Sequence, residues 1–91
     1  MHDLTGFQRD VLYVVVGLGE PDEEELKAHL EEYYESEINH SRLFPNLDTL
    51  IDTGLLQEAP HDERPDHYSV TDQGHRVLQR HRDWKRQYVD R

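Results

Sequence analysis

The chain has 91 residues, with 20 Asp and Glu against 10 Lys and Arg, so its formal net charge is −10. A surface of that sign repels a polyanion, and the bulk composition by itself argues against a nucleic-acid partner. The lack of cysteine excludes disulfides and thiolate metal sites, and no apolar run approaches the roughly 20 residues that span a bilayer. We expect one soluble, cytoplasmic domain over residues 1–91, with no membrane segment.

The first predicted element is a helix that begins after Thr5 and ends at the glycines of residues 17–19. Thr5 and Gln8 have the spacing of a capping box. The apolar residues that follow recur at helical spacing, and they are Phe7, Val11, Leu12, Val15, Val16 and Leu18. The β-branched run 14–16 would also suit a strand, but the cap and the spacing favour a helix.

A second helix is predicted from Asp22, which can cap it together with Glu25, to about Glu35. Glutamates at 23–25 occupy the first turn, where the helix dipole favours negative charge. The predicted buried stripe of this helix consists of Leu26, Leu30, Tyr33 and Tyr34.

A third helix should begin between Asn39 and Ser41 and end before Gly54, which suits a left-handed C-terminal cap. Its predicted inward face consists of Leu43, Leu47, Leu50 and Ile51. Pro45 is tolerable only in or just after the first turn, where backbone N–H groups have no helical partner. This proline moves the expected start toward Ser41.

The remaining residues predict a small hairpin and a last helix. Residues 55–59 and 67–70 can form two strands around the polar, proline-containing loop 60–66. Thr71 can cap a helix over residues 72–89, in which Gly74 is a weak point. The predicted fold is therefore mainly α with a small β-hairpin (α+β), in the order ααα-ββ-α. This order is that of a winged helix-turn-helix, whose third helix enters the major groove of DNA.

The segment 39–56 resembles the recognition-helix region of PadR-type regulators. The residues that carry the resemblance are Leu43-Phe44-Pro45, Leu47, Leu50, Gly54-Leu55, and Tyr68-Ser69-Val70-Thr71 followed by Gly74. The resemblance covers roughly residues 5–88 and implies a homodimeric DNA-binding transcription factor, most often a repressor. The chain departs from the family at Phe44, where members usually have Tyr, and at Asp48 and Thr49, where they often have basic residues.

Candidate DNA contacts follow from the faces of the third helix. With the leucines inward, Arg42, Asn46 and Thr49 form one outward row, and these residue types can read guanine, adenine and the thymine methyl group. The first turn can hold a phosphate, and an arginine at the wing tip can enter the minor groove. The predicted DNA-binding residues are Asn39, His40, Ser41, Arg42, Asn46, Thr49 and Arg64. Ordinary solvated surface is the alternative for each of them.

The last helix, residues 72–89, is predicted to form a dimer interface because aromatic side chains anchor interfaces. The expected interface residues are Val77, Leu78, His81, Trp84 and Tyr88. These side chains could instead pack in the small hydrophobic core of the single chain. The surrounding basic residues could contact DNA or pair with the acidic second helix. A small-molecule effector beside Trp84 also stays an open alternative.

No motif for a metal, a cofactor or catalysis is present in the sequence. The seven histidines show no ligand-dense spacing, and His61 and His67 form only a loose loop cluster with residues 62–63. A nucleophile elbow and a phosphate-binding loop are also missing. We expect no enzyme activity and no cofactor.

The acidic balance of the chain has two alternative explanations. Residues 1–60 hold 14 Asp and Glu against three Lys and Arg, whereas residues 61–91 hold six against seven. The acidic, lysine-poor surface resembles that of halophilic-archaeal proteins and would then reflect the host. The second explanation is a winged-helix protein-interaction module, in which the acidic residues 23–37 bind a basic partner.

Overall fold

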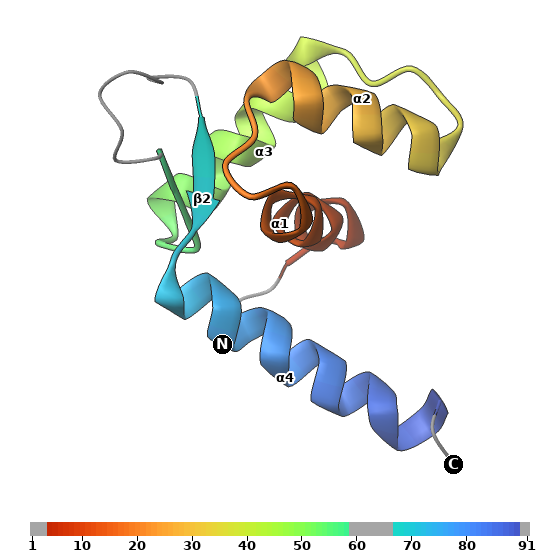
Figure 1. Ribbon diagram of the computed structural model, residues 1–91, viewed down its shortest axis with the longest axis vertical. Coiled ribbons are helices and arrows are strands. Elements are labelled where there is room, and N and C mark those ends of the chain that lie inside the picture. Colours follow the sequence, from red (N-terminus) through yellow and green to blue (C-terminus); the bar gives the residue numbers. More distant parts are fainter. Residues whose placement is uncertain (1–3, 59–66, 90–91) are drawn as a thin grey trace.

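A computed structural model describes residues 4–58 and 67–89 of the chain (Figure 1). Its elements are α1 (Gly6–Leu18), α2 (Glu23–Tyr34), α3 (His40–Asp52), β1 (Leu56–Glu58), β2 (Tyr68–Val70) and α4 (Asp72–Val89). This order confirms the predicted ααα-ββ-α arrangement. α1 lies in the middle of the molecule, with α2 and α3 on one side and α4 on the other (Figure 1). The predicted wing loop, with Arg64 and His61, lies outside the described residues.

The helix starts follow from local capping. Thr5 with Gln8 and Asp22 with Glu25 each form a complete capping box, as the sequence predicts. The Asn39 side chain accepts a hydrogen bond from the backbone N–H of Arg42 and caps α3. These caps satisfy donors that a helix leaves without partners at its N-terminus, so each helix begins at a chemically defined residue.

α3 begins at His40, within the predicted range of Asn39 to Ser41, but Pro45 does not move the start to Ser41 and lies instead in the second turn. A proline there removes a helical hydrogen bond and costs about 3 kcal/mol. Burial of Leu43, Leu47 and Leu50 offsets this cost, since one buried leucine contributes roughly 1.5–3 kcal/mol. Gly54 ends the segment at a φ of +81°, which confirms the predicted left-handed cap.

β1 and β2 pair antiparallel and are shorter than the predicted strands, with Leu56 opposite Val70 and Glu58 opposite Tyr68. Because a two-stranded hairpin is marginal alone, its stability depends on α1, α3 and α4, all of which contact it. Gly74 is not the weak point that the sequence indicated. A Cβ atom there would lie 2.3 Å from the carbonyl oxygen of Leu55, so glycine is what allows α4 to approach the hairpin.

The core is formed mainly by leucines of α1, α2 and α3 and by the hairpin. Its buried hydrophobic residues are Phe7, Val11, Leu12, Val15, Leu26, Leu30, Ile38, Leu43, Leu47, Leu50, Leu55, Leu56, Tyr68 and Leu78. The prediction that Tyr33 is buried is wrong, because this side chain is 71% exposed. Ile38, in the turn before α3, is fully buried and was not among the predicted core residues. Ile51 and Tyr34 are only half-buried. Over residues 4–58 and 67–89, none of the helices is long and apolar enough to cross a membrane.

Candidate nucleic-acid interface

The outer face of α3 is exposed along its length. Because its leucines face the core, the opposite side of the helix consists of Ser41, Pro45, Asp48, Thr49 and Asp52, of which all are exposed. This face carries two carboxylates and no Lys or Arg. It offers hydroxyl groups to a ligand but repels phosphate.

Arg42 lies on the flank of α3 that faces the N-terminal end of α1. Its guanidinium carbon is 4.1 Å from the centre of the Phe7 ring and 5.8 Å from the centre of the Tyr34 ring. A cation over an aromatic face gains about 0.5–1 kcal/mol at an exposed site. The side chain is therefore positioned by α1 and α2, although Arg42 as a whole is exposed.

Asn46 is more firmly held on the same flank. The Gln8 side-chain amide donates to its Oδ1 over 3.0 Å, and its own Nδ2 donates to the Arg42 carbonyl over 2.8 Å. Thr49 is exposed, and its carbonyl oxygen accepts hydrogen bonds from Thr53. Arg42, Asn46 and Thr49 thus share one side of α3, but only Thr49 has a side chain with no hydrogen bond or ring contact among the described residues.

The predicted phosphate-binding residues at the start of α3 also have intramolecular partners. Asn39 accepts from the Ser41 hydroxyl over 2.7 Å, in addition to its capping bond. The His40 Nδ1 atom lies 2.5 Å from a Glu23 carboxylate oxygen, and its ring stacks on Phe44 with 5.1 Å between centroids. A phosphate at this helix end would compete with Glu23 for His40.

A half-buried polar contact lies beneath Arg42. The Tyr34 hydroxyl donates to Asp10 of α1, and the ring of Tyr34 contacts that of Phe7. Burial, followed by the hydrogen bond to Asp10, raises the pKa of Tyr34 to about 12. Tyr34 therefore stays a neutral donor at ordinary pH and joins α2 to α1 beneath Arg42.

The residues predicted to form a dimer interface divide into two groups along α4. Leu78 is only 1% exposed and belongs to the chain's own core, so its assignment to an interface is corrected: a side chain already covered by α1 has no surface for a partner. Val77 is half-buried against the core. Trp84 and Tyr88, by contrast, are 56% and 60% exposed, and their ring centroids lie 5.3 Å apart.

His81 stands between these two groups. Its Nδ1 atom is 3.1 Å from the hydroxyl of Tyr13, and its ring stacks on Trp84 with 6.2 Å between centroids. Burial, and then the nearby charges of Arg9 and Lys85, lower the pKa of His81. The contact with Tyr13 connects the middle of α4 to α1.

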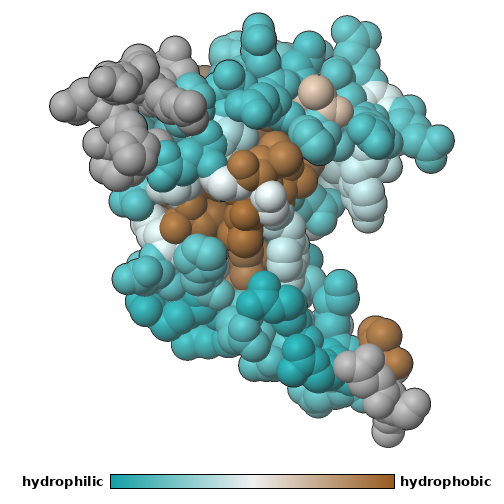
Figure 2. Space-filling model, in the orientation of Figure 1, coloured by the Kyte–Doolittle hydropathy of each residue, from teal (hydrophilic) through white to brown (hydrophobic). Residues whose placement is uncertain are grey.

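Apolar surface gathers in the hollow between α2 and α4, over α1 (Figure 2). A groove of about 240 Å³ lies between α1 and α2 and is lined by Asp10, Tyr13, Val14, Leu30 and Tyr33. Most of this lining is apolar or aromatic. The groove can accept an aromatic or aliphatic group but carries no constellation of groups for catalysis.

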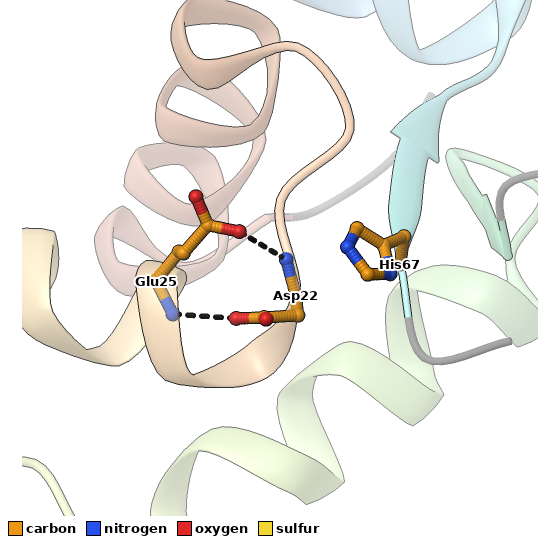
Figure 3. Close-up of side chains that lie close together, drawn as sticks. All are labelled: Asp22, Glu25 and His67. Atoms are coloured by element: carbon orange, nitrogen blue, oxygen red, sulfur yellow. Dashed lines mark hydrogen bonds between the residues drawn. The ribbon is translucent and has the colours of Figure 1, made fainter. Parts of the chain in front are cut away.

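Three potential metal ligands meet at the base of the wing, where the start of α2 approaches the start of β2 (Figure 3). Asp22, Glu25 and His67 each bring a ligand atom to within 4.8 Å of the others. Sequence reasoning missed this cluster because His67 is 45 residues from Asp22, and because both carboxylates were already explained as helix caps. The isolated bridge between Asp22 and His67, a tertiary feature, brings them together.

Comparison with known families confirms the predicted PadR-type resemblance. The pattern of the transcriptional regulator PadR-like family matches residues 12–80, more than half of the chain. A search of curated proteins finds no match.

Solved structures of RosR from H. salinarum are similar to this chain throughout. A complex described as hsRosR-S4 has a TM-score of 0.86 at 37% identity, covering 97% of this chain and 76% of that chain. A RosR structure grown from NaBr gives 0.85 at 37%, covering 97% and 80%. F93 from STIV, a winged-helix DNA-binding protein, has a TM-score of 0.70 at 16% identity, covering 98% and 96%. This last likeness concerns the fold alone and, with the RosR structures, confirms the winged-helix fold.

Proposed function

The chain belongs to the transcriptional regulator PadR-like family, and from this premise we propose that it binds double-stranded DNA as a homodimer and represses transcription in the cytoplasm. Members of this family act as transcription regulators and not as enzymes. In the proposed complex α3 enters the major groove and the wing contacts flanking DNA. The observation that carries the proposal is the exposed outer face of α3 directly beside the hairpin.

Arg42 is the residue that we propose to read a base. Leaving the Phe7 ring loses about 0.5–1 kcal/mol, whereas a bidentate contact with guanine gives about 1–3 kcal/mol of discrimination. Replacing the contact with Phe7 by a contact with guanine is therefore favourable in free energy. Asn46 must give up two hydrogen bonds, each of about 0.5–1.5 kcal/mol, so its contribution is smaller than that of Arg42. Thr49 can meet a thymine methyl group without losing a side-chain partner.

The contacts to phosphate are proposed for the start of α3 and for the wing. Asn39, His40 and Ser41 lie at the helix N-terminus, where backbone N–H groups and the dipole favour an anion. Arg64 is the one basic residue of the predicted wing tip. Since Asp48 and Asp52 repel the backbone, we expect binding to rely on base contacts more than on phosphate neutralisation.

We expect high salt to favour DNA binding, because it weakens the repulsion between the acidic protein and the DNA backbone. At 1 M salt the Debye length is about 3 Å, so the repulsion from a net charge of −10 is largely screened. A protein with few phosphate contacts also loses little affinity through counterion release. We therefore expect specific binding to persist at molar salt.

The homodimer is proposed from the exposed second half of α4. Residues 82–89 are all exposed in the single chain, and an isolated helical segment of this length is marginal in water. Trp84 and Tyr88 supply the large apolar surface that anchors interfaces. A second copy is the occupant that we propose, because a two-fold dimer also matches a palindromic operator.

The test of DNA binding compares the protein's own promoter fragment with scrambled DNA from low to molar salt. We expect wild type to prefer the promoter. Arg42→Ala should lose roughly 1–3 kcal/mol of discrimination between bases at one position of the site. Arg82→Ala is the matched control, because it removes the same charge from α4, where the one hydrogen-bond partner of Arg82 among the described residues is Gln79. An Arg42→Ala variant that binds like wild type would remove Arg42 from the interface.

The test of the dimer is sedimentation of wild type and Trp84→Ala at several concentrations. We expect wild type to be a dimer and Trp84→Ala to shift toward monomer, with His75→Gln, an exposed position in the first half of α4, unchanged. A monomeric wild type at high micromolar concentration would contradict the proposed assembly.

A second candidate function is binding of a basic protein through the acidic surface. Asp48 and Asp52 on the outer face of α3 favour it, as do the five glutamates of α2 against its one lysine. Absence of any DNA preference at every salt concentration would favour this candidate over DNA binding.

A further inference from the structure

We propose that Asp22, Glu25 and His67 bind a divalent transition-metal ion at the base of the wing. The three side chains come from two places in the fold: the N-terminus of α2 and the start of β2 (Figure 3). Their ligand atoms, one nitrogen and two carboxylate oxygens, all lie within 4.8 Å of one another. This inference concerns a site separate from the outer face of α3 and does not require that the protein bind DNA.

The backbone holds these ligands together without an ion. Asp22 and His67 form an isolated antiparallel bridge, and the backbone N–H of Tyr68 donates to the Pro21 carbonyl over 3.0 Å. The positions of two ligands are thus determined by main-chain contacts, and the third is one helical turn away on α2. Little ordering of the chain is needed on binding, which favours affinity.

Each carboxylate still has an oxygen to offer. In the capping box Asp22 Oδ1 accepts from the Glu25 backbone over 2.8 Å, and Glu25 Oε1 accepts from the Asp22 backbone over 3.1 Å. The second oxygens, Asp22 Oδ2 and Glu25 Oε2, have no hydrogen bond within residues 4–58 and 67–89. A metal can therefore be bound while both caps persist.

The imidazole of His67 supplies an independent observation. Its Nδ1 atom is buried and has no hydrogen-bond partner among the described residues. Buried polar atoms in folded proteins nearly always have partners, and an ion or a water is a common explanation for an exception. An imidazole nitrogen together with two carboxylate oxygens is also a donor set that metal ions use.

The donor set selects the class of ion. Ca²⁺ takes six to eight oxygen ligands, whereas imidazole favours Zn²⁺, Co²⁺ and their neighbours. Zinc bonds of about 2.0–2.2 Å imply ligand separations of about 3.3 Å in a tetrahedron, so the ligand atoms, which lie within 4.8 Å of one another, must move closer by up to about 1.5 Å. Water completes the shell. The two negative carboxylates, Asp22 and Glu25, outweigh the roughly half positive charge of the α2 N-terminus. The site therefore attracts a cation.

The experiment titrates metal-free protein with Co²⁺, followed by its visible absorption, and with Zn²⁺, followed by calorimetry. We compare wild type with His67→Gln, Asp22→Asn and Glu25→Gln. Asparagine remains a good N-cap and glutamine still completes a capping box, so these variants keep α2 folded. The matched control is His29→Gln, which removes an exposed histidine from the same helix.

We expect one site in wild type that weakens at least about tenfold in each of the three variants and is unchanged in His29→Gln. Zn²⁺ should also raise the melting temperature of wild type and of His29→Gln, but not that of His67→Gln. Circular dichroism without metal checks that all variants are folded. No saturable binding up to millimolar Co²⁺, or equal binding by wild type and His67→Gln, would overturn the proposal.

Discussion

The body formed by α1, α2, α3 and the hairpin differs from α4 in packing and in charge. The body supplies every buried core side chain except that of Leu78, while α4 is exposed on all sides from residue 82 to 89. α2 carries five glutamates and one lysine, whereas α4 carries five Lys and Arg against two aspartates. The body is therefore stabilised by the burial of its own side chains. The second half of α4 is an exposed surface, which we propose that a second copy of the chain covers.

The largest expected effect separates the two halves of α4. Leu78→Ala should lower the free energy of unfolding by about 2–5 kcal/mol, because it leaves a cavity in the core. Val89→Ala, which truncates an exposed side chain, should change it by less than about 0.5 kcal/mol. Urea denaturation of both variants measures the difference. Similar losses would show that the end of α4 packs as the beginning does.

Gly74→Ala tests how closely α4 approaches the body. The added methyl group would meet the Leu55 carbonyl and Val70, so we expect a loss of about 1–3 kcal/mol. Gly17→Ala is the control, since nothing lies within 4 Å of its Cβ position, and it should gain about 0.5–1 kcal/mol in α1. Thermal melts of the two variants should move in opposite directions. A neutral Gly74→Ala would mean that the hairpin and α4 separate easily.

Thr71→Ala compares the cap of α4 with that of α1. Thr71 accepts from the Gly74 backbone and donates to the Gly54 carbonyl, so it joins α4 to the end of α3 as well as capping it. We expect a loss of about 1–2 kcal/mol, larger than the roughly 1 kcal/mol expected for Thr5→Ala. Chemical denaturation orders the two variants. The reverse order would make the Gly54 bond unimportant.

The smallest expected effect is a pH dependence at the contact between α1 and α4. The lowered pKa of His81 means that the folded protein binds this proton less readily than the unfolded chain does. Stability from this group is therefore complete above the unfolded value of about 6.5 and falls as pH drops below it. His81→Gln should flatten the wild-type stability curve below pH 6.5, while His75→Gln, an exposed control, should not. Equal curves for wild type and His81→Gln would remove the contact as a cause.

Local signals were sufficient for the elements of the body. The capping boxes at Thr5 and Asp22 and the glycine at 54 were predicted correctly because each depends on residues within one turn. Periodicity also identified most of the core. It failed for Tyr33 and Ile38, because a helix face or a turn residue is buried only where another element covers it.

The candidate site was less predictable than the fold. The row Arg42, Asn46 and Thr49 was placed correctly on one side of α3. Its engagement with Phe7 and Gln8 of α1 depends on how two helices cross, and no sequence spacing records that. Whether these residues contact DNA stays a prediction.

Residue patterns were enough to predict where helices begin and end, the order of the elements and the family, because caps, turns and hydrophobic periods are local. Three further features emerge from the packing of the folded chain: Gly74 is a close-contact position, Leu78 belongs to the core while Trp84 does not, and His67 meets Asp22 and Glu25. These outcomes depend on distances between segments far apart in the chain. Such distances arise from the packing of whole elements, which no single residue pattern encodes.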